Sequence, residues 1–94
     1  MSKKVLHLTL ERKWFDQIAR GEKLVEYREL KAYWYKRLTY MGSKLKFKEF
    51  DEIHFRNGYG KDSPFMRVKY LCTEIKFSRF NIYLGDILEI KNWK

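Results

Sequence analysis

The fold is decided by residues 65–90, which read FMRVKYLCTEIKFSRFNIYLGDILEI. Over 65–72 apolar and polar residues alternate, which is the pattern of a strand with one buried face. The apolar positions change parity beyond this run, and the change predicts a bulge or bend near Thr73. A further strand is expected over 80–84, followed by a turn at Gly85–Asp86 and a final short strand. Strands therefore dominate the second half of the chain.

The first half of the chain mixes strands with two helices. Periodicity predicts α-helices over 12–20 and 32–40 and strands over 5–10, 23–30, 44–48 and 52–57. Gly21 follows the first helix as a C-terminal cap would, and Gly42 with Ser43 interrupts the second. Because the strands follow without a repeated strand–helix–strand rhythm, we expect an α+β fold. The predicted architecture is one domain over 1–94, a small and mostly antiparallel β-barrel of five or six strands with two α-helices in its N-terminal half.

The chain is strongly basic. Its 21 Lys and Arg against 12 Asp and Glu give a net charge of +9 in 94 residues, and aromatic residues make up 18% of the sequence. The apolar and aromatic content excludes a disordered tail, and the charge favours a polyanionic partner such as RNA. The alternative is a basic surface that serves only solubility, since both signs of charge are interspersed along the chain.

The sequence also lacks the signatures of several protein classes. No apolar run approaches the ~20 residues of a membrane span, and the N-terminus lacks a signal-peptide core, so we expect a cytoplasmic protein without membrane contact. The one cysteine, Cys72, is expected to pack in the core. The sequence has one cysteine and two histidines, His7 and His54, which are too few for a zinc site, and it has no phosphate-binding glycine loop. We therefore expect no metal site and no cofactor. The sequence gives no signal for an oligomeric state.

The densest polar cluster is GEKLVEYRE, residues 21–29, directly after the first predicted helix. Lys23 and Arg28 are candidate ligands for a phosphate or an oxyanion, and Glu26 is a candidate base that activates water. Lys23 and Glu26 are therefore the candidate catalytic residues. In the structural alternative, Glu26 and Arg28 form an ion pair that ties the loop to the barrel.

A second cluster, RNGYGK at residues 56–61, combines turn glycines with side chains typical of nucleic-acid contacts. Asn57 can hydrogen-bond a base edge, Tyr59 can stack on a base, and Arg56 can hold a phosphate. The alternative is an ordinary hairpin whose tyrosine covers the core.

The first cluster, together with Leu8-Thr9-Leu10 before it, resembles the activating signal cointegrator homology (ASCH) family. The family pattern Gly-x-Lys-x-x-Glu-x-Arg is met by Gly21, Lys23, Glu26 and Arg28. Residues 55–59 and the closing LGDILEI, residues 84–90, also look like compact ASCH proteins of bacteria and phages. The resemblance covers nearly the whole chain.

The resemblance implies a PUA-like β-barrel with a cleft between barrel and helices, and RNA or nucleotide recognition as its role. Some small relatives are amidohydrolases that deacetylate N4-acetylcytidine, and others are ribonucleases. The amidohydrolase lysine corresponds to Lys23, but Glu26 stands where those enzymes have a threonine, and Glu74 is the nearest candidate for their distant glutamate.

We therefore expect an RNA- or nucleotide-binding domain, with a hydrolase acting on RNA or a modified nucleoside as the alternative. The expected ligand contacts are Lys23, Arg28, Arg56, Asn57 and Tyr59. Lys23 and Arg28 are expected to share one pocket with Asn57 or Tyr59 on its opposite wall. The aromatic run 33–35 is expected to serve packing.

Overall fold

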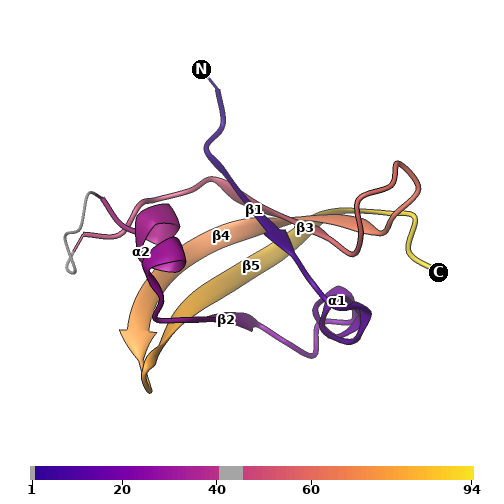
Figure 1. Ribbon diagram of the computed structural model, residues 1–94. Helices are drawn as coiled ribbons and strands as arrows, with labels where there is room; N and C mark the ends of the chain where they lie inside the picture. The colour runs from indigo at the N-terminus through magenta and orange to yellow at the C-terminus, as the bar shows by residue number, and fades with distance from the viewer. Residues whose placement is uncertain (1, 41–45) are drawn as a thin grey trace.

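The computed structural model describes residues 2–40 and 46–94, in which two helices and five strands form an α+β fold (Figure 1). In chain order the elements are β1 (Val5–Thr9), α1 (Arg12–Ala19), β2 (Val25–Glu29), α2 (Ala32–Leu38), β3 (Glu52–Arg56), β4 (Phe65–Lys76) and β5 (Arg79–Lys91). The five strands, with both helices in the N-terminal half of the chain, confirm the predicted fold class.

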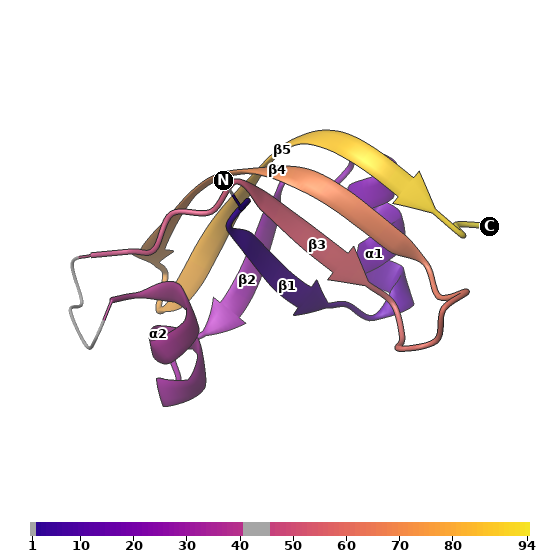
Figure 2. The same cartoon turned by 90° about the horizontal axis from the view of Figure 1, so that it is seen from above.

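The strands form one curved sheet in the order β1-β3-β4-β5-β2. The β1–β3 pairing is parallel and the other three pairings are antiparallel. Figure 2 shows the long strands β4 and β5 arching over, with β1 and β2 beneath. In the described part of the chain β1 and β2 are the two edges of the sheet, so the expected barrel is a half-barrel with an open seam.

The core fills the concave side of this arch. Alternate residues of the central strands, such as Ile53, Phe55 and Val68, are fully buried there. Phe15 of α1 and Leu38 of α2 are also fully buried, so each helix covers part of the same core. Figure 1 shows the two helices at the two ends of β2, which fixes their spacing across the seam.

Gly21 ends α1 as the sequence predicts. Its φ of +77° lies in the left-handed region that favours glycine, and its N–H donates to the carbonyl of Ile18 at 3.0 Å. The chain then turns directly into Lys23 and β2, which brings the first polar cluster to the seam.

The predicted turn at Gly85–Asp86 is wrong, because β5 runs unbroken from Arg79 to Lys91. A Cβ at Gly85 would lie 3.1 Å from the Leu71 side chain and 3.2 Å from both Cβ and the carbonyl oxygen of Lys69. Glycine therefore permits close approach of the paired strands, where register shifts occur, rather than a chain reversal.

The parity change in β4 is confirmed, and it lies just before Thr73. Register shifts against β5 extend from Arg67 to Cys72, and Tyr70 and Thr73 are both buried. The same shift exposes Cys72, and the prediction that this thiol packs in the core is wrong.

Residues 42–44, which carried the predicted helix break and the start of a short strand, lie outside the described residues. Beyond them, Phe47 makes only an isolated antiparallel bridge to Thr39. Within the described ranges, no helix has the length and apolar character that crossing a bilayer requires.

Candidate ligand-binding groove

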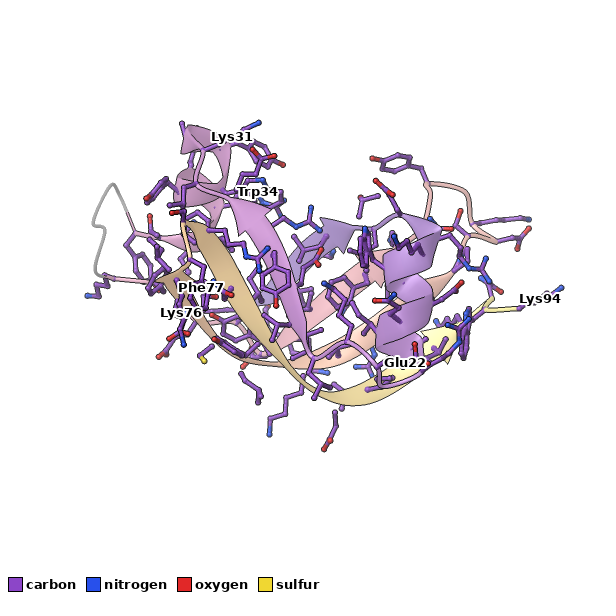
Figure 3. All side chains as sticks on the ribbon, turned by 90° about the horizontal axis from the view of Figure 1, so that it is seen from below. Glu22, Lys31, Trp34, Lys76, Phe77 and Lys94 are labelled. Carbon is purple, nitrogen blue, oxygen red and sulfur yellow. The ribbon has the colours of Figure 1, made fainter. Side chains whose placement is uncertain are left out.

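The open seam of the half-barrel is a groove of about 640 Å³. The end of β1, strand β2, one aromatic residue from each helix and the start of β5 line it: Thr9, Leu10, Glu11, Trp14, Lys23, Glu26, Tyr27, Arg28, Glu29, Trp34 and Arg79. Figure 3 views the molecule from this side, with Trp34 beside β2 and α1 across from it. The groove thus lies where the sheet fails to close.

Glu26 is the buried centre of the groove. The residue is 6% exposed, although it lies on an edge strand. Arg28 donates to its Oε2 at 2.6 Å, and Lys23 Nζ lies 3.5 Å from its Oε1. Glu26 and Arg28 share a face because strand side chains alternate with a period of two. Lys23 and Arg28 line one cavity, as expected, and Glu26 and Arg28 form the ion pair of the structural alternative.

Arg28 also bridges the seam. Its guanidinium donates to the carbonyl of Thr9 at 3.2 Å, so a side chain joins β2 to β1 where no backbone ladder does. Its Nε is buried and has no hydrogen-bond partner among the described residues. A buried donor without an acceptor costs about 1–3 kcal/mol, so an acceptor supplied by a ligand would recover stability here.

The aromatic side chains of the groove hold its cations in place. Lys23 Nζ lies 5.0 Å from the Trp14 ring centroid and 4.7 Å from that of Tyr27, while the Arg79 guanidinium lies 3.6 Å from the Tyr27 ring. Arg28 stacks 4.9 Å from the Trp34 ring. Each cation therefore lies against a ring face, and Lys23 and Arg28 are also held by the charge of Glu26.

The charges of the groove are mixed rather than uniformly positive. Lys23, Arg28 and Arg79 oppose the carboxylates of Glu11, Glu26 and Glu29. Glu29 is 75% exposed and pairs outward with Lys31, so its charge is partly neutralised away from the groove floor. For Arg79 the described residues supply no carboxylate within 4.0 Å. The site combines cationic donors with one buried acceptor.

The second sequence cluster does not share this groove, so the predicted common pocket is wrong. The Asn57 amide donates to the carbonyl of Leu10 at 2.9 Å and holds β1 against the end of β3. Tyr59 is 89% exposed in the β3–β4 loop, and Arg56 lines a separate cavity. The parallel pairing of β1 with β3 sets Arg56 opposite Thr9, and none of Arg56, Asn57 and Tyr59 lines the groove.

Glu74, the candidate for a distant catalytic glutamate, also lies away from the groove. It accepts a hydrogen bond from the Tyr83 hydroxyl and does not line the cavity. The pKa of Tyr83 is raised, mainly by this bond.

Of the aromatic and basic residues that line the groove, four were not among the predicted site residues: Trp14, Tyr27, Trp34 and Arg79. Trp34 was expected to serve packing and Trp14 shows helical spacing, yet both line the cavity as well as packing against the core. Tyr27 and Arg79 carry no motif, and they meet because β2 pairs with β5 in a register that places Tyr27 opposite Asn81, two residues from Arg79. A long-range pairing of this kind leaves no local signal.

Across residues 2–40 and 46–94, no three His, Cys, Asp or Glu side chains are grouped in a way that would hold a metal ion. Comparison of the chain with protein-family models, with curated proteins and with solved structures gave no match.

Proposed function

We propose that the seam groove binds RNA or a nucleotide, as an ASCH-like, PUA-like domain would. The observation that carries the proposal is the set of three cations, Lys23, Arg28 and Arg79, which aromatic rings hold around one cavity beside a buried carboxylate. A nucleotide matches both kinds of group. Its phosphate accepts from the cations, and the N–H groups of its base donate to Glu26.

The geometry favours binding over hydrolysis. Both oxygens of Glu26 face cations, Arg28 at 2.6 Å and Lys23 at 3.5 Å. Both oxygens are engaged by cations, so the carboxylate serves as an ion-pair partner and neither oxygen is free to take a proton from water. The hydrolase alternative keeps one supporting feature, since the same two cations would stabilise an oxyanion near Glu26.

The test is the salt dependence of affinity for a short single-stranded RNA. With about 3–5 phosphate contacts, the slope of log affinity against log salt is expected to be about −2 to −3.5. Lys23→Gln is expected to flatten the slope by about 0.7, one phosphate contact. A flat response in the wild type, or no binding at low salt, contradicts the proposal.

Lys69→Gln is the matched control. Lys69 is exposed on the outer face of β4 and does not line the groove, yet its removal changes the net charge equally. An equal loss of slope in both variants would show that affinity follows net charge instead of the groove.

A further inference from the structure

A second cavity lies behind the groove wall, on the outer side of the sheet at the β3–β4 loop. It has a volume of about 270 Å³, and its lining is Arg56, Lys61, Ser63, Phe65, Lys91 and Asn92. Three of these side chains are cations and none is a carboxylate. Unlike the groove, this cavity has one sign of charge.

The strand register builds the floor of this cavity. Arg56 of β3, Phe65 of β4 and Lys91 of β5 are consecutive register partners, so they form one row across three strands. The Arg56 guanidinium lies 4.6 Å and the Lys91 ammonium 5.7 Å from the Phe65 ring centroid. Neighbouring strands are only ~4.8 Å apart, so the row sets two cations beside one aromatic ring.

Two carboxylates of the neighbouring strands, Glu52 and Glu89, are already engaged. Glu52 is 5% exposed and accepts from Lys3 at 2.7 Å, from Arg67 at 3.0 Å and 3.1 Å, and pairs with His54 at 3.0 Å. Glu89 pairs with Arg67 at 2.9 Å and more loosely with Lys91, at 3.6 Å.

This leaves Arg56 and Lys61 with no carboxylate within 4.0 Å in the described part of the chain. Arg56 and Lys61 therefore converge on the cavity without an ion-pair partner among the described residues, and an anion would relieve their mutual repulsion.

The loop beside the cavity is braced in position. Ser63 Oγ accepts from the N–H of Gly60 at 3.0 Å, which leaves its own proton free to donate. A Cβ at Gly58, whose φ is +108°, would lie 2.9 Å from that oxygen, so glycine is required for the loop to close on Ser63. The Asn92 amide reaches the carbonyls of Lys61 and Ser63, each at 3.4 Å.

We infer that this cavity binds a phosphate group. Arg56 provides a planar fork for two phosphate oxygens, Lys61 and Lys91 provide point charges, and the Ser63 hydroxyl adds a neutral donor. A phosphate reaches the site either in a nucleic-acid backbone or as a free ion or nucleotide. The site is separate from the seam groove, and the inference does not depend on the function proposed there.

The test titrates inorganic phosphate, then pyrophosphate, into the ¹⁵N-labelled protein at constant ionic strength set with chloride. Saturable shifts are expected at the backbone amides of 58–63 and at the Arg56 Nε–H. The double variant Arg56→Gln/Lys61→Gln is expected to weaken binding by about five- to tenfold, as the loss of two charge-assisted contacts at a partly exposed site implies. The matched control is Lys4→Gln/Lys69→Gln, which removes two exposed cations outside the cavity.

Absence of signal shifts at the backbone amides of the loop, or equal weakening of phosphate binding in both double variants, overturns the inference. A second arm measures the salt slope for an eight-nucleotide oligouridylate. If Arg56→Gln/Lys61→Gln flattens that slope by about 1.4, two phosphate contacts, the phosphate belongs to a nucleic-acid backbone. If inorganic phosphate binds but the double variant leaves the salt slope unchanged, the site takes a free phosphate. If no oligonucleotide binds at all, the groove proposal is refuted and the phosphate inference is not affected.

Discussion

Replacing Glu26 by glutamine tests whether this carboxylate holds the groove together. The change keeps the shape and removes the charge that Arg28 contacts at 2.6 Å and Lys23 approaches at 3.5 Å. Removing one partner of a fully buried ion pair costs about 3–5 kcal/mol. Because Lys23 and Arg28 remain 13% and 18% exposed, and the glutamine oxygen still accepts a hydrogen bond, we expect a smaller loss of about 1.5–2 kcal/mol.

The assay is thermal and urea unfolding of Glu26→Gln beside Glu22→Gln. A domain of this size loses ~4–8 °C in Tm per kcal/mol, so a drop of about 6–16 °C is expected. Glu22 is 57% exposed and makes a loose ion pair with Arg20 at 3.8 Å. The free energy of unfolding of Glu22→Gln should therefore stay within about 0.5 kcal/mol of wild type. A Tm for Glu26→Gln equal to that of Glu22→Gln would refute the role of Glu26 in organising the groove.

The same variant separates binding from catalysis. If Glu26 only organises the cations, its loss leaves them freer and phosphate affinity rises, by up to about fivefold at a partly exposed pair. If Glu26 activates water, hydrolysis of RNA or N4-acetylcytidine falls by about 10²–10⁴ while binding survives. Loss of inorganic phosphate affinity in a folded Glu26→Gln protein would contradict both, whereas a loss confined to nucleotides would reflect the base contact with Glu26.

Three further predictions follow from the structure. Hydrogen bonds, the first from Lys3 and the next from His54, lower the pKa of Glu52 from its ordinary 4.5 to about 2 in the folded protein. The stability that this carboxylate contributes is therefore complete above pH 4.5 and is lost as the pH falls toward 2. In this window the Tm of Glu52→Gln should fall less steeply with decreasing pH than that of wild type, and parallel curves would contradict the role of Glu52. Tyr59→Ala should change the free energy of unfolding by no more than about 0.5 kcal/mol, because the side chain is 89% exposed. It should weaken the binding of an RNA long enough to reach the β3–β4 loop by about 1–3 kcal/mol. Unchanged affinity would show that Tyr59 does not contact the RNA. Phe77 and Ser78 form the tip of the β4–β5 hairpin, where their φ angles are 56° and 60° (Figure 3 labels Phe77). Asn-Gly adopts these angles more readily, so the double change Phe77→Asn/Ser78→Gly should raise the free energy of unfolding in urea by about 1 kcal/mol or more. Destabilisation would show that Phe77 has a packing role.

Local patterns in the sequence predicted most of the elements. Apolar alternation and helical spacing are local signals, and they located both helices and strands β1 to β4 to within a few residues, but they divided β5 in two at Gly85. The failures at Gly85 and Cys72 have one cause. Both lie where β4 and β5 pair with shifted register, and the pairing partner of a residue is not encoded beside it.

The candidate site was predictable in part for the same reason. Lys23, Glu26 and Arg28 are close in sequence, so one short segment brings them together. The rest of the groove depends on contacts between distant segments, such as Arg79 on the Tyr27 ring. Asn57 was misplaced because the parallel β1–β3 pairing, which no local pattern signals, turns its amide toward Leu10.

The three tryptophans provide the most direct measurement of the central claim, that the seam groove binds a nucleotide. Trp14 and Trp34 line the groove, whereas the indole N–H of Trp93 donates to Asp16 at 2.9 Å outside it. In ¹H–¹⁵N spectra, titration with uridine 5′-monophosphate should shift the indole signals of Trp14 and Trp34 saturably and leave that of Trp93 in place. Unmoved signals for Trp14 and Trp34, or equal shifts of all three, would contradict the account.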